Sequence, residues 1–241
     1  MTADTANAAS FALRLARVIW SPSRAFRALR EKPTWLGAFL VIGLGSAAIT
    51  WLTVPVLQKI SLSALSPFLV APQIQQIVHL NHLAHWAATM AAFLSTPVSW
   101  FISAFLLWLI AQVFEGLPSF KAIFAVVAHA NVVFLISGYL VVVLVQVKSR
   151  GGTPDLQDLD IRLGLDLFWR GELHPALRAA LASFNPFNLW YYGLLIVGTA
   201  TVCRFSVLRA IGVIGSLWAL NLAFAAGFAW VIGSLTAATP T

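Results

Sequence analysis

Histidines are the side chains of this 241-residue chain that come nearest to a catalytic or metal-binding pattern. His79, His82 and His85 recur at every third residue, so successive members lie about 60° apart around a helix. Zinc usually takes three or four ligands, and neither a cysteine nor a carboxylate lies near this series in the sequence. The favoured interpretation is a wet polar face of a helix, with metal binding as the alternative, and no metal is expected.

His129 lies inside an apolar stretch and is a second candidate for chemistry. It follows Lys121 by eight residues, which at about 1.5 Å per helical residue places it ~12 Å into the stretch, near the middle of a bilayer. An ionisable group at that depth is a functional candidate by default. No carboxylate lies in any apolar stretch to relay a proton, so we favour a neutral imidazole that shares a polar cluster with Asn131 or Asn221.

The sequence contains no nucleophile elbow, zinc-protease motif, phosphate-binding loop or dinucleotide fingerprint. Such motifs bring a nucleophile, a metal or a phosphate to backbone or side-chain partners at fixed spacing. Their absence predicts a protein that is not an enzyme and that uses no cofactor.

Five charge-free stretches indicate the elements that would position these residues. The chain is 60% hydrophobic and 10% charged, whereas soluble domains are about 25% charged. A bilayer core of ~30 Å needs ~20 apolar residues as helix, because the backbone must satisfy its own hydrogen bonds there. We expect an all-α membrane bundle with five transmembrane helices, at about residues 34–54, 87–114, 122–147, 187–203 and 210–235.

An amphipathic arm at residues 1–33 precedes this membrane domain of residues 34–241. Apolar residues recur at helical spacing, and Ser21-Pro22 predicts a helix restart. Such an arm lies in the membrane interface with its cations on anionic headgroups, or packs on the cytosolic end of the bundle. Both alternatives remain open from the sequence. The expected headgroup contacts are the arginines at Arg14, Arg17, Arg24, Arg27 and Arg30.

Three shorter features lie between and within the expected spans. Residues 55–86 are interrupted by Pro67 and Pro72, and we interpret them as an interfacial or re-entrant segment. Thr96-Pro97 predicts a kink in the second span. Apolar and polar residues alternate over residues 159–167, a period typical of a strand.

A ridge of small residues recurs at every fourth position of the last span. Small side chains let helix backbones approach closely in a bilayer. We favour packing inside the bundle, with dimerisation as the alternative. The ridge consists of Gly215, Ala219, Ala223 and Gly227.

The charges flanking the spans predict the orientation. With a cytosolic amino terminus, the cytosolic segments carry nine cations and three acids, and the outer segments carry six cations and five acids. The positive-inside rule therefore favours a cytosolic amino terminus and an outer carboxyl terminus. The basic residues gather at helix ends, which predicts contact with the lipid bilayer and its anionic headgroups rather than with nucleic acid.

Several short motifs resemble one protein family. Asn185-Pro186-Phe187-Asn188-Leu189-Trp190, followed by Leu194-Leu195 and Gly198, is similar to the start of the fourth span in bacterial Ypt-interacting-protein (Yip) domain proteins. Gly116 to Lys121 with the run Ala125 to Ala130, and Pro22 to Phe26 before Lys32-Pro33 and Trp35, resemble that family too. The likeness implies five spans and a cytosolic amino terminus.

Eukaryotic members of this family act in vesicle traffic and contact Rab-type GTPases. They usually carry a longer cytosolic region with acidic-aromatic motifs, which this sequence lacks, so the resemblance does not extend to the GTPase role.

We therefore expect a non-catalytic protein of the bacterial inner membrane that organises the membrane or scaffolds a membrane-protein partner or a second copy of itself. The alternative is a permease or channel for a small solute or ion, with a polar path near His129 and Asn221. A polar cavity running through the bundle would favour the second hypothesis.

Overall fold

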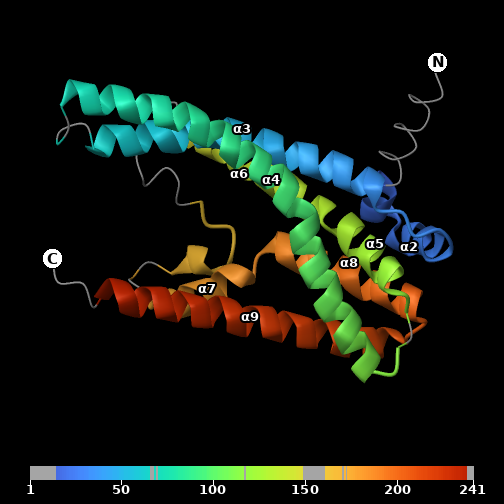
Figure 1. Ribbon diagram of the computed structural model, residues 1–241. Helices are drawn as coiled ribbons and strands as arrows, with labels where there is room; N and C mark the ends of the chain where they lie inside the picture. The colour runs from blue at the N-terminus through green and yellow to red at the C-terminus, as the bar shows by residue number, and fades with distance from the viewer. Residues whose placement is uncertain are drawn as a thin grey trace, which may run out of the picture.

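The computed structural model of the chain describes residues 15–65, 68, 70–116, 118–148, 161–169, 171 and 173–237. This part of the chain is helical and contains no β-strand, which confirms the all-α prediction. A helical turn at residues 15–20 precedes the labelled elements. These are α2 (Pro22–Glu31), α3 (Leu36–Leu65), α4 (Ala71–Val113), α5 (Phe120–Ala130), α6 (Val132–Lys148), the 3-10 helix η4 (Leu165–Phe168), α7 (Pro175–Ser183), α8 (Pro186–Cys203) and α9 (Val207–Ala237) (Figure 1).

Four segments of the described chain are long and apolar enough to cross a membrane. They are Leu36–Ser63, Ala71–Val113, Phe120–Lys148 and Val207–Val231. The fourth expected span, at residues 187–203, corresponds to α8 and is not among them. It has 18 residues, about 27 Å of helix, but its first two turns carry Asn188, Trp190 and two tyrosines in place of aliphatic side chains.

The hairpin of α3 and α4 corrects one prediction. The sequence predicts a separate interfacial or re-entrant segment at residues 55–86, but in the described part of this range α3 continues through Pro55 to Leu65 and α4 is already helical at Ala71. A helix satisfies its own backbone hydrogen bonds in water as it does in lipid, so polar side chains do not end it. The 30 residues of α3 span about 45 Å, more than the ~30 Å bilayer core.

Two contacts hold the far part of this hairpin together. The Gln58 side-chain amide of α3 donates a hydrogen bond to the Asn81 carbonyl of α4 at 2.6 Å. The rings of Trp51 and His85 lie 4.1 Å apart, centroid to centroid. The Gln58 contact joins the two helices beyond the expected end of the first span at residue 54.

Helix α4 bends along its length, and Pro97 lies inside it (Figure 1). Proline has no N–H for the carbonyl four residues earlier, and its ring pushes that carbonyl aside. The hydroxyl of the neighbouring Thr96 donates to the Ala92 carbonyl, four residues before Thr96, at 2.8 Å. The bend agrees with the kink predicted at Thr96-Pro97.

Helix α5 forms the centre of the bundle. Every residue from Ala122 to Ala130 is buried. A turn at Asn131 separates α5 from α6, so the expected span of residues 122–147 consists of two helices. Gly198 of α8 faces Val126 of α5, and a Cβ at Gly198 would collide with the Val126 side chain. Glycine at this position therefore allows α8 to lie directly on α5.

The segment before α7 corrects a second prediction. The strand expected at residues 159–167 is wrong over its described part, because residues 161–163 pair with no strand and residues 165–168 form η4. The side chain of Asp166 turns inward and is only 6% exposed, since the 3-10 turn breaks the alternation of faces that a strand would keep.

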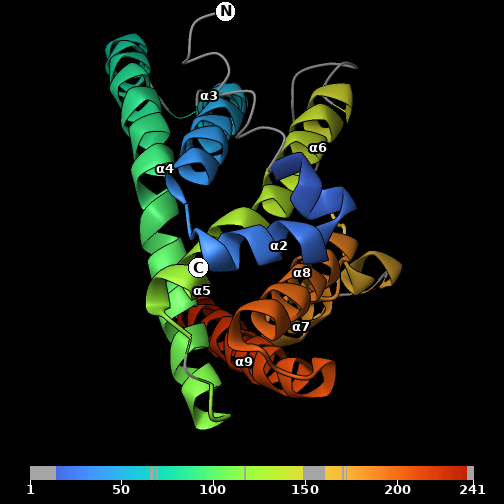
Figure 2. The same cartoon turned by 90° about the vertical axis from the view of Figure 1, so that its right-hand side faces the viewer.

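The ends of the helices gather in two groups. The arm helix α2, the α4–α5 connection and the α8–α9 connection lie at one end of the molecule (Figure 1). The carboxyl end of α3, the amino end of α4 and the carboxyl end of α9 lie at the other. Figure 2 looks at the first end, with α2 in front of the helices it crosses.

Candidate functional site

The amino-terminal arm packs on the bundle through its apolar stripe. Val18 and Phe26 are fully buried, and Leu15 and Leu29 are nearly so. The Phe26 ring lies against α8, where a Cβ on Gly198 would be 3.4 Å from it. The predicted restart at Ser21-Pro22 is confirmed, since α2 begins at Pro22. The arm therefore follows the second sequence alternative, docking on the end of the bundle.

A cavity of about 840 Å³ lies between this arm and α5. Three cations and one acid line it, together with hydroxyl groups and small apolar side chains. The lining residues are Arg17, Val18, Ser21, Arg24, Ala25, Ala28, Leu29, Glu31, Lys32, Thr34 and His129. With histidine neutral, these side chains carry an excess of two positive charges.

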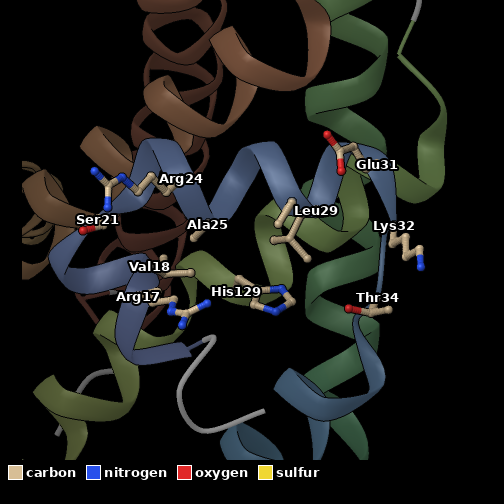
Figure 3. A pocket seen from close by; sticks show the side chains of 11 residues that line it. Arg17, Val18, Ser21, Arg24, Ala25, Leu29, Glu31, Lys32, Thr34 and His129 are labelled. Atoms are coloured by element: carbon tan, nitrogen blue, oxygen red, sulfur yellow. The ribbon is translucent and has the colours of Figure 1, made fainter. Parts of the chain in front are cut away.

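Figure 3 shows how the polar side chains of this cavity are directed. Arg17 points toward His129, and the Thr34 hydroxyl turns toward the same space from the opposite side. Arg24 and Lys32 stand at opposite edges and extend outward, and the Glu31 carboxylate points away from the centre. Positive charge therefore surrounds the cavity, while Glu31, the one acid among its described lining residues, is turned aside.

His129 contributes the cavity wall on the side of α5. It is 4% exposed, and its Nδ1 lies 2.8 Å from the Ala125 carbonyl. A carbonyl only accepts, so Nδ1 carries the proton in this hydrogen bond. The charged arm residues share the cavity with His129, so this imidazole borders a polar space.

The three residues predicted to form an intramembrane polar cluster lie at separate places. Asn131 donates to the Val127 carbonyl at 2.8 Å and hydrogen-bonds to the Tyr191 side chain. Asn221 donates to the Leu217 carbonyl at 3.0 Å and is exposed on α9. Asn131 lines a different cavity from the one that His129 lines, and neither cavity includes Asn221.

The five arginines predicted to contact headgroups divide into three groups. Arg17 and Arg24 line the cavity. Arg27 and Arg30 are exposed on α2 and do not line it, and Arg27 donates through Nε to the Ser23 carbonyl at 3.2 Å. Arg14 lies outside the described residues.

The histidines of α4 do not converge on a metal site. His79 and His82 are exposed, whereas His85 packs on Trp51 and its Nε2 lies 3.2 Å from the Trp51 carbonyl. No group of three or more potential ligands from His, Cys, Asp and Glu comes together in the described residues.

The small-residue ridge of α9 faces outward. All four ridge residues are exposed, and a Cβ on Gly215 or Gly227 would meet nothing within 4 Å. The favoured expectation of packing inside the bundle is wrong, because α9 buries its opposite face through Ala210, Val213 and Leu217.

A second cavity, of about 290 Å³, was missed by the sequence reasoning. It lies between α3, α4 and the α5–α6 turn, and the polar side chains that line it are Ser46, Ser95, Thr96, Ser99 and Asn131. Three hydroxyl residues within five positions of a charge-free stretch, beside a proline, were the available signal. The first cavity left no such local signal, since His129 lies almost a hundred positions after Lys32 and Thr34.

Comparisons with known proteins agree with the helical architecture. The Yip1 domain model matches residues 16–229, which include the arm, both cavities and most of α9. A search of curated proteins and a search of solved structures each find no match. Proteins of the Yip1 family are generally non-catalytic membrane-trafficking proteins.

Proposed function

This chain belongs to the Yip1 domain family of multi-span membrane proteins, and from that premise we propose that it is a non-catalytic organiser of a bacterial inner membrane. In this proposal the exposed ridge of α9 holds a membrane-protein partner or a second copy of the chain. The amino-terminal arm contacts anionic headgroups. It carries out no covalent chemistry and needs no cofactor.

The proposed topology has five spans, with α8 as the fourth. The arm and the α4–α5 and α8–α9 connections would then lie in the cytosol, and the carboxyl terminus outside. The grouping of helix ends in Figure 1 supports this proposal, because two crossings separate each of these segments from the next and therefore return the chain to the same end. The excess of cations in the same segments supports the same direction.

The exposure of the α9 ridge is the observation that carries the proposal. Small residues favour close helix approach through dispersion, which can drive association in lipid. The chain itself uses the opposite face of α9, so the ridge is left to a helix from outside the chain. The large apolar side chains Phe224 and Phe228 are also exposed and would flank such a helix.

Cysteine crosslinking in native membranes tests this assembly. Cys203 is the chain's one cysteine, so a Cys203→Ser background makes each introduced thiol unique. Ala223→Cys, on the ridge, should give a covalent homodimer or a covalent adduct with a second membrane protein on mild oxidation. Ala210→Cys, buried on the opposite face of the same helix, is the matched control and should give neither. Equal, low crosslinking at both positions would remove the proposed assembly.

The second cavity favours one competing function, a permease for a small polar solute. Hydroxyls lining a cavity between membrane-spanning helices are typical of solute pathways, where they replace hydration. Ser99→Leu would fill this space with a larger, apolar side chain. If wild-type proteoliposomes take up a solute and proteoliposomes containing this variant do not, the protein is a permease. If wild type takes up none of the sugars, amino acids and ions tested, that function is dismissed.

A further inference from the structure

We propose that the cavity between the arm and α5 is a stoichiometric binding site for the headgroup of one anionic glycerophospholipid, with the lipid phosphate held beside Arg17 and Thr34 and between the outer cations Arg24 and Lys32. This inference deepens the proposed contact of the arm with anionic lipid, on which it rests. It assigns the lipid contact to one defined binding site, instead of a general attraction between the basic arm and an anionic membrane surface.

The charges around the cavity select an anion. Three cations and one acid line it, and Figure 3 shows the Glu31 carboxylate turned away from the centre while Arg17 points inward. Arginine donates paired N–H groups that match two phosphate oxygens, and a threonine hydroxyl can donate a further hydrogen bond. A zwitterionic headgroup would bring its own cation among these side chains, so an anionic lipid fits better.

The size and apolar lining of the cavity fit a lipid rather than a free phosphate ion. A space of about 840 Å³ is within the range of pockets that hold ligands of drug size. A free phosphate ion, with its five atoms, would fill only a small part of it. Val18, Ala25 and Leu29 line it as well and offer contacts to glycerol and the first methylene groups.

The place of the cavity in the fold supports the same ligand. Lys32 and Thr34 line it, and the first candidate membrane span begins at Leu36. The cavity therefore lies beside the start of the first candidate span, where we expect the phosphates of the surrounding lipids. Basic pockets at such helix ends are a known means of binding anionic headgroups.

Two arginines on the same helix provide the matched control. Arg27 and Arg30 are exposed like Arg24, but they do not line the cavity. A diffuse surface attraction depends on charge number alone, so it treats arginines that line the cavity and arginines that do not line it alike. A built site distinguishes them.

The test uses the full-length protein in nanodiscs of phosphatidylcholine with increasing fractions of phosphatidylglycerol, and counts bound anionic lipid by native mass spectrometry. We expect one retained phosphatidylglycerol per wild-type chain. Arg17→Gln with Arg24→Gln should weaken its retention by about thirtyfold, the factor that two basic contacts at a membrane surface provide. Arg27→Gln with Arg30→Gln should retain it within about threefold of wild type.

A second variant removes the space and leaves the charge unchanged. Ala28 lines the cavity and is exposed on α2, so Ala28→Phe should exclude the lipid without unfolding the arm. Thermal melting of each variant verifies that the bundle is intact. Retention by Ala28→Phe equal to wild type would overturn the site.

The remaining outcomes separate this inference from the broader proposal. Equal weakening by the two arginine pairs would leave a diffuse lipid contact and overturn the built site. If neither double arginine variant weakened lipid retention, both the built site and the broader proposal that the arm contacts anionic lipid would be overturned. Displacement of the lipid by millimolar glycerol phosphate would show that the cavity takes a soluble phosphate, which would overturn the lipid assignment.

Discussion

Removing the Phe26 ring should release the amino-terminal arm from the bundle. Phe26 is fully buried against α8, and truncating a buried phenylalanine to alanine typically costs ~3–5 kcal/mol. Since 1.4 kcal/mol is a factor of ten, Phe26→Ala should raise the population of the released arm more than a hundredfold. Trp20 lies on the same arm and is 82% exposed, so Trp20→Ala should change this population little.

Limited trypsin digestion of the full-length protein in detergent measures this release. A protease cuts a docked helix only after it opens locally, so the cleavage rate follows the population of the open arm. Cleavage after Arg24 and Arg27, followed by mass spectrometry, should accelerate more than a hundredfold in Phe26→Ala. Equal cleavage rates in Phe26→Ala and Trp20→Ala would refute the docking of the arm on the bundle.

Two further substitutions test packing elsewhere. Gly198→Leu places a side chain where Val126 already lies, so we expect overpacking by ~1–3 kcal/mol or more and a lower melting temperature in detergent; an unchanged melting temperature would show that α8 does not lie on α5. Ala219→Leu with Ala223→Leu adds bulk on the exposed face of α9, so the monomer should keep its melting temperature while crosslinking on the ridge is lost. A large loss of monomer stability in this double variant would show that the ridge packs inside the bundle.

The sequence was sufficient for features that depend on local composition. The charge-free stretches predicted spans at about 34–54, 87–114, 122–147 and 210–235, because the bilayer imposes the same length and apolarity on every spanning helix. Each of them overlaps a candidate membrane-spanning segment of the structure, at 36–63, 71–113, 120–148 and 207–231. Local chemistry also predicted the restart at Ser21-Pro22, and the family motifs agreed with the Yip1 match.

The sequence was insufficient for features that depend on which helix face is exposed or on contacts between segments far apart in the chain. Polar residues and prolines at 55–86 look alike whether a helix ends at the membrane surface or continues into water, and only the pairing of α3 with α4 distinguishes the two. The ridge on α9 has the same spacing whether it faces inward or outward. The cavity beside His129 depends on α2 crossing α5, which no local pattern records.

Reporter fusions in cells test the proposed five-span arrangement most directly, because they decide whether α8 crosses the membrane. A fusion near Asp158 follows three spans in either case and should report the outer face. If α8 crosses, a fusion at Val207 should report the cytosol and one at Thr241 the outer face, as we predict. An outer signal at Val207 with a cytosolic signal at Thr241 would leave four spans, place both termini on one side and contradict the proposed topology.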